Sequence, residues 1–182
     1  MLKIPEYQEY GGETQIALMD NSSLAFMHEL SRNSYPADRI LRVYDLILIP
    51  KWVTEEIEDS TYRSNYVEQL RAQGYPVCWI DETKYGAFVN DEDVNLYYIV
   101  EVAVSRVSEL MRYLRRNIKT EDLLDLPSAE KWMDQLYKEW PIHGRRLSTG
   151  RILKKNAGEI SLTILAEVFA WYHDEVDAYG LQ

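Results

Sequence analysis

Short apolar runs alternate with polar, helix-starting segments along the first half of the chain. Three runs are too short for helices and are typical of buried parallel strands: residues 16–19, 46–49 and 74–80. Helix-capping residues follow the first run, and Pro50 ends the second. We expect helices at about 24–30, 35–44 and from 52 onward, and another that ends at Gly74. This alternation predicts an α/β protein, a three-layer α/β/α fold with a short parallel sheet and right-handed crossovers.

The second half of the chain is dominated by apolar positions three and four residues apart. This spacing predicts one long amphipathic helix over 91–116 and another that opens at Ser128 and stops at Pro141. We interpret residues 85–145 as a helical pair inserted into a single domain of residues 1–182. A last helix, 158–173, is apolar over much of its circumference and should be largely buried.

The two ends of the sequence show weaker patterns. Residues 1–14 are polar and aromatic, contain Gly11-Gly12, and read as a loosely held lead-in. Residues 174–182 are too few for another strand–helix unit. The N-terminus lacks the apolar core of a signal peptide, and no stretch approaches the ~18 apolar residues that cross a bilayer. These features favour a cytoplasmic protein without a membrane partner.

Composition narrows the class of protein only slightly. The 182 residues, 46% hydrophobic and 27% charged, suit one globular domain with a full core. The net charge of −10 argues against a protein that coats nucleic acid by overall charge. Five cations gather locally in one short segment: Arg145, Arg146, Arg151, Lys154 and Lys155. They are either contacts for a phosphate backbone or a solvated loop that balances a negative surface.

Three acidic residues stand beside signals that would bring them together. Asp20 ends the first apolar run, Glu56 follows Pro50 within a helix, and Glu159 opens the last helix. Strand ends and helix starts meet along one edge of a parallel sheet, where such sheets bind ligands. Clustered carboxylates repel one another unless a hard cation lies between them, so the pattern predicts a Mg²⁺ or Mn²⁺ site. Each residue also has a simpler interpretation: a helix cap, a solvated helix face and a first-turn acid.

The same three segments resemble the motifs of PIN-domain nucleases. They are an apolar strand followed by Asp-x-Ser (16–22), an apolar strand followed by Pro and Val-x-x-Glu-aliphatic (50–57), and Ala-Gly-Glu at a buried helix start (157–162). The resemblance covers roughly residues 15–82 and 150–175 and implies a PIN-like, Rossmann-like fold. It implies that Asp20, Glu56 and Glu159 are catalytic metal ligands and that the hydroxyl of Ser22 supports the site.

The resemblance also implies an activity and partners. The expected reaction is Mg²⁺- or Mn²⁺-dependent hydrolysis of RNA phosphodiester bonds, as in the toxins of toxin–antitoxin pairs, with an antitoxin or another protein as partner. The family's fourth acidic residue follows one more strand in an aliphatic-Thr/Ser-Asp-Asp setting, which residues 174–182 lack; Asp174 and Asp177 are the candidate substitutes. Two alternatives stay open: a protein-binding module with an incomplete site, and a structural subunit whose insertion helices form a homodimer or larger oligomer.

Overall fold

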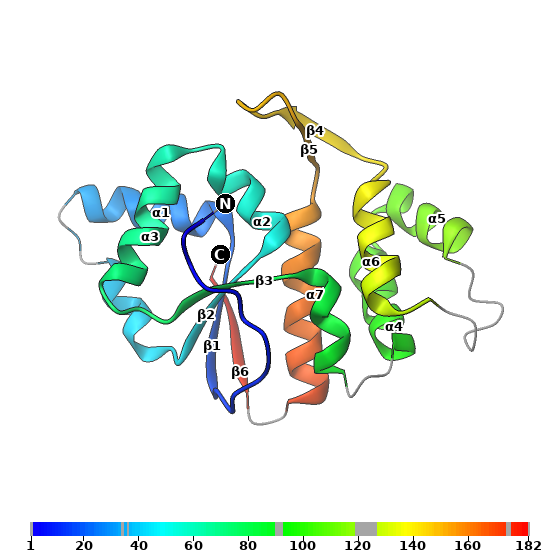
Figure 1. Ribbon diagram of the computed structural model, residues 1–182, viewed down its shortest axis with the longest axis horizontal. Coiled ribbons are helices and arrows are strands. Elements are labelled where there is room, and N and C mark those ends of the chain that lie inside the picture. Colours follow the sequence, from blue (N-terminus) through cyan, green and yellow to red (C-terminus); the bar gives the residue numbers. More distant parts are fainter. Residues whose placement is uncertain are drawn as a thin grey trace.

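The computed structural model describes residues 2–33, 35, 37–89, 93–118, 127–173 and 176–181. Its core is a parallel sheet with strand order β3-β2-β1-β6. The strands are β1 (Gln15–Met19), β2 (Leu46–Pro50), β3 (Val77–Ile80) and β6 (Asp177–Leu181). Helices cover both faces of this sheet (Figure 1), which confirms the expected three-layer α/β/α architecture.

The helices and the small second sheet follow the chain in a simple order. The first half contains α1 (Asn21–Arg32), the 3₁₀ helix η1 (Ala37–Val43), α2 (Lys51–Glu58) and α3 (Thr61–Ala72). The second half contains the 3₁₀ helix η2 (Glu82–Phe88), α4 (Asp93–Val104), α5 (Ser108–Asn117), α6 (Ala129–Lys138) and α7 (Ala157–Tyr172). An antiparallel pair, β4 (His143–Arg146) and β5 (Ile152–Lys154), precedes α7 and projects from the body of the molecule (Figure 1).

Alternating strand residues divide the core into two layers. Ile16 and Leu18 of β1 point toward α7, whereas Ala17 and Met19 point toward α1 and α3. All four are almost completely buried, because helices cover both faces of a parallel sheet. Beyond α7, on the side away from the sheet, lie α4, α5 and α6 (Figure 1). The insertion helices therefore extend the layer that contains α7.

The first insertion helix is broken, so the prediction of one long helix over 91–116 is wrong. Residues 105–107 separate α4 from α5, and Val107 has an extended backbone with φ of −118°. β-Branched residues crowd this region and lower its helix propensity. The break lets Leu110 and Leu114 reach the core together with Val104, and all three are fully buried. The segment therefore forms two helices, α4 and α5, and α6 follows them along the chain.

Both ends of the chain are more ordered than the sequence indicates. The prediction that residues 1–14 form a loosely held lead-in is wrong, because Leu2, Ile4 and Tyr7 are buried. Tyr7 N donates to Trp79 O at 2.7 Å, which docks this segment beside β3. At the other end β6 forms a strand and pairs with β1 along its whole length. Residues 174–182, expected to be too few for another strand–helix unit, therefore supply the edge strand of the sheet.

Within the described residues, no helix is long and apolar enough to cross a membrane.

Candidate active site

The carboxyl ends of the strands carry the helix starts that the sequence indicated. Asp20 immediately follows β1, α2 begins directly after β2, and the first turn of α7 lies near the same edge (Figure 1). This is the edge at which open α/β sheets bind ligands. The topology thus brings Asp20, Glu56 and Glu159 to one end of the sheet.

Asp20 is half-buried and caps α1. Its Oδ1 accepts from the backbone N of Ser23 at 2.6 Å and from the Ser23 hydroxyl. The structure thus shows the helix-cap role, one of the two interpretations of this residue. The cap uses Oδ1. Ser22, expected to support the site, lies exposed on the first turn of α1, and the hydroxyl that bonds Asp20 belongs to Ser23.

Glu56 lies half-buried on α2, close to the start of α7. Its Oε2 accepts from Asn21 Nδ2 at 3.2 Å. Burial raises the pKa of Glu56, and the charge of Glu159 raises it further. Gly158 allows this approach: a Cβ there would lie 3.1 Å from Val53 Cγ2 and 3.7 Å from Glu56 Oε1. The close packing of α2 against α7 thus explains why a glycine stands in the Ala-Gly-Glu motif.

Asp20 and Glu159 line a common cavity of about 250 Å³ between β1, β6 and α7. Glu167 also lines it, together with Thr163 and with Gly180 of β6. Sequence reasoning missed Glu167. The available signal was helical spacing, because residues 159, 163 and 167 follow at intervals of four and share one face of α7. Three carboxylates therefore border one cavity, although Glu56 is not among its lining residues.

The donor set suits a hard divalent cation, since Mg²⁺ and Mn²⁺ prefer carboxylate oxygens and water. Within the described part of the chain, however, no three His, Cys, Asp or Glu side chains lie close enough together to hold a metal ion. Three of these carboxylates already accept from polar neighbours: Asp20 from Ser23, Glu56 from Asn21 and Glu167 from Trp171. A cation would have to draw these side chains toward the cavity.

The candidate for the fourth acidic residue falls at the wrong edge. Asp177 begins β6, pairs in register with Gln15, and accepts from Gln15 Nε2 at 3.1 Å. The amino-terminal end of the strand is opposite the edge where Asp20 lies, so Asp177 cannot complete the site. Asp174 lies outside the described residues.

The five cations before α7 lie on the β4–β5 hairpin and at its base, and α2 neutralises two of them. Arg145 donates to Asp59 Oδ2 at 2.7 Å, and Arg151 lies 3.4 Å from Glu55 Oε1. Lys154 lies over the Tyr137 ring, 4.6 Å from its centre. Among described residues, Arg146 and Lys155 have no acidic ion-pair partner. Hydrogen bonds chiefly lower the pKa of Glu109, and Lys155 lies near enough for its charge to lower that pKa further, but it forms no ion pair with Glu109, so Arg146 and Lys155 are the cations most available to an external anion.

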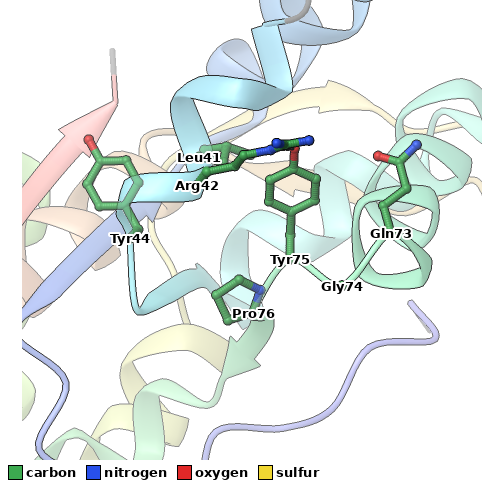
Figure 2. Close-up of a pocket in the computed structure, with 7 residues that line it drawn as sticks. All are labelled: Leu41, Arg42, Tyr44, Gln73, Gly74, Tyr75 and Pro76. Carbon is green, nitrogen blue, oxygen red and sulfur yellow. Dashed lines mark hydrogen bonds between the residues drawn. The ribbon is translucent and has the colours of Figure 1, made fainter.

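Another cavity, of about 570 Å³, lies at the opposite edge of the sheet (Figure 2). Tyr44, which lines it, lies two residues before β2, and Pro76 directly precedes β3. Arg42 Nε donates to the Tyr75 hydroxyl at 3.3 Å across its upper wall. No acidic residue is among those that line it, so this cavity does not compete with the carboxyl edge as a cation site.

Compared with protein-family models, with curated proteins and with solved structures, the chain matches none.

Proposed function

We propose that this protein is a metal-dependent ribonuclease whose site lies at the carboxyl edge of the sheet. The observation that carries the proposal is the cavity that Asp20 and Glu159 share, with Glu56 close enough for the charge of Glu159 to raise its pKa. Carboxylates gathered at this edge are the arrangement that phosphodiester hydrolysis with Mg²⁺ or Mn²⁺ requires. The resemblance to PIN-domain nucleases supports the same reaction and RNA as the substrate.

In this proposal Asp20 and Glu159, which line the same cavity, would hold the cation. Glu56, whose Oε2 accepts from Asn21, would be a third ligand, and Glu167 would add negative charge on the α7 side. A bound Mg²⁺ or Mn²⁺ would lower the pKa of a coordinated water, which favours hydroxide as the nucleophile, and would offset charge on the phosphate. Gly158, in the first turn of α7, allows α2 and α7 to pack closely beside these carboxylates.

Metal titration tests the proposal most directly. Purified protein should bind Mn²⁺ saturably, and Asp20→Asn should weaken that binding by about tenfold or more, because an amide does not offset the charge of the cation. The matched control is Glu130→Gln, which removes an exposed first-turn acid on α6 and should leave binding unchanged. Calorimetry checks this prediction, and absence of saturable binding in the unmodified protein would overturn it.

The unpaired cations at the hairpin give a second prediction. The double variant Arg146→Glu, Lys155→Glu should weaken binding of single-stranded RNA by about tenfold, and the loss should shrink as salt is raised. The control Arg71→Glu, Lys131→Glu makes the same change in net charge at exposed positions on α3 and α6. Filter binding at several salt concentrations measures both; equal losses in the two variants would leave only a general charge effect.

One observation favours a second candidate function, a protein-binding module. A groove of about 280 Å³ lies between α4 and α7, and three apolar side chains at it are strongly exposed: Tyr98 (49%), Val102 (58%) and Trp171 (65%). Exposed apolar grooves mark interaction sites. With a net charge of −10, the chain would repel a second copy and favour a partner segment that is apolar and flanked by basic residues. Failure of Mn²⁺ to bind would leave this function as the better proposal.

A further inference from the structure

A carboxyl group that the proposed reaction does not use lies fully buried beside the site. Glu82, the first residue of η2, has no exposed surface. Its Oε1 accepts from Trp52 N at 2.8 Å and from Ser161 Oγ at 2.8 Å. The Tyr85 hydroxyl lies 2.9 Å from the same Ser161 oxygen. Among described residues, Oε2 has no hydrogen-bond partner. Burying a carboxyl group with one unpaired oxygen costs free energy, so a functional role would explain its presence here.

These bonds join the two helices that carry candidate ligands. Trp52 lies in the first turn of α2, four residues before Glu56, and Ser161 lies two residues after Glu159 on α7. The amide of Trp52 has no partner within its own helix, as is general for a first turn. Glu82 therefore ties the start of α2 to α7 through a single oxygen atom. Gly158 makes the neighbouring contact between the same helices.

We propose that Glu82 is the positioning residue that sets the separation of Glu56 and Glu159, and that its ionisation loosens this setting. This inference rests on the proposed function, because it concerns the geometry of the same metal site. When neutral, the carboxyl keeps both donors on Oε1, and only the proton on Oε2 has no partner among the described residues. When ionised, it carries a charge on an oxygen without a donor, so α2 and α7 must shift to admit one.

The surroundings of Glu82 decide where that ionisation occurs. The positive charge of Lys51 on α2 faces Glu82, but Lys51 already forms an ion pair with Asp81. The negative charge of Asp81 repels an ionised Glu82. The hydroxyls of Tyr85 on η2 and Tyr137 on α6 also face it, and α7 contributes only the Ser161 hydroxyl. Burial dominates this balance and raises the pKa of Glu82 to about 8. The carboxyl is therefore neutral at pH 6.5 and largely ionised at pH 8.5.

Three variants test the role of Glu82. Glu82→Gln keeps an acceptor for both donors but cannot ionise. Glu82→Met removes the acceptor. Ser161→Ala removes one of the two donors and serves as the second variant if Glu82→Met does not fold. Nuclear magnetic resonance follows the Trp52 amide as pH is raised from 6 to 9.5, and follows the Gly158 amide as Mg²⁺ is added at pH 6.5 and 8.5. In the unmodified protein the Trp52 amide should titrate near pH 8, and in Glu82→Gln it should not.

The Mg²⁺ affinities then separate positioning from folding. At pH 6.5, Glu82→Gln should match the unmodified protein, whereas Glu82→Met or Ser161→Ala should bind about tenfold more weakly. At pH 8.5 the unmodified protein should bind several-fold more weakly than Glu82→Gln. A Trp52 amide that does not titrate above pH 6, or a Mg²⁺ affinity equal in all variants, overturns the positioning role. If Mg²⁺ has no effect on Gly158 in the unmodified protein, the ribonuclease proposal fails, while the Trp52 titration still measures the link between the helices.

Discussion

With Mn²⁺ present, the purified protein is expected to cut single-stranded RNA, and Asp20→Asn or Glu159→Gln should each slow cutting by at least about 100-fold. That factor corresponds to about 2.7 kcal/mol of transition-state stabilisation. Both side chains border the cavity in which the proposal places the cation. Each substitution removes one negative charge with almost no change in shape, so the effect should fall on metal and phosphate rather than on packing. Gel analysis of end-labelled RNA measures the rates.

Folding of these variants can be judged in advance from their roles in the structure. Asparagine is as good a helix cap as aspartate, so Asp20→Asn should preserve the bond to Ser23 and the start of α1. Glu159→Gln removes an exposed first-turn acid from α7 and should cost ~0.3–1 kcal/mol of stability. Glu130→Gln, which also removes a first-turn acid, from α6, should cut RNA at the unmodified rate. Cutting that persists in both site variants, or without added metal, would contradict the ribonuclease proposal.

The sheet could be predicted wherever local pattern and tertiary burial agree. The apolar runs at 16–19 and 46–49 became β1 and β2, because every residue in them is covered on one face or the other. β6 could not be found in this way, since Asp177–Leu181 has no apolar run and exists through its pairing with β1. Pairing between segments more than 150 residues apart leaves no local trace. The break between α4 and α5 was missed because spacing alone cannot show where a helix bends.

The sequence predicts which edge of the sheet carries the candidate site, but not the side-chain contacts within it. Strand ends and helix starts placed Asp20 and Glu159 on one cavity, a consequence of parallel topology. Side-chain partners depend on distances of a few ångströms, so neither the Ser23 cap on Asp20 nor the Asn21 bond to Glu56 was visible in the sequence. Glu82 was missed for the same reason. It follows Asp81 in a polar segment that reads as solvated, and only the fold buries it.

The stability of the protein is expected to fall as pH rises from about 5 to 8, and Glu82→Gln should remove most of that fall. The folded-state pKa of Glu82 is about 8, against an ordinary value of 4.5. Between these values the folded protein holds a proton that the unfolded chain has released, so unfolding releases it and raising pH favours unfolding. The slope contributed by one such group reaches about 1.4 kcal/mol per pH unit. Across the window this amounts to several kcal/mol, comparable to the whole stability of many domains.

Urea unfolding at pH 5.5, 7 and 8.5 measures this effect as a difference between variants. The lowered pKa values of Asp45, Asp59 and Asp81 act in the opposite direction, but only in the acid range below about pH 4. Glu56, with its raised pKa, acts with the same sign as Glu82 and is unchanged in the variant. The free energy of unfolding of Glu82→Gln minus that of the unmodified protein should therefore rise with pH. At pH 5.5 it should be slightly negative, because the new amide NH₂ has no acceptor where Oε2 had no partner. A difference that stays constant from pH 5.5 to 8.5 would mean that Glu82 ionises at its ordinary pKa, and the buried link between α2 and α7 would then carry charge at neutral pH.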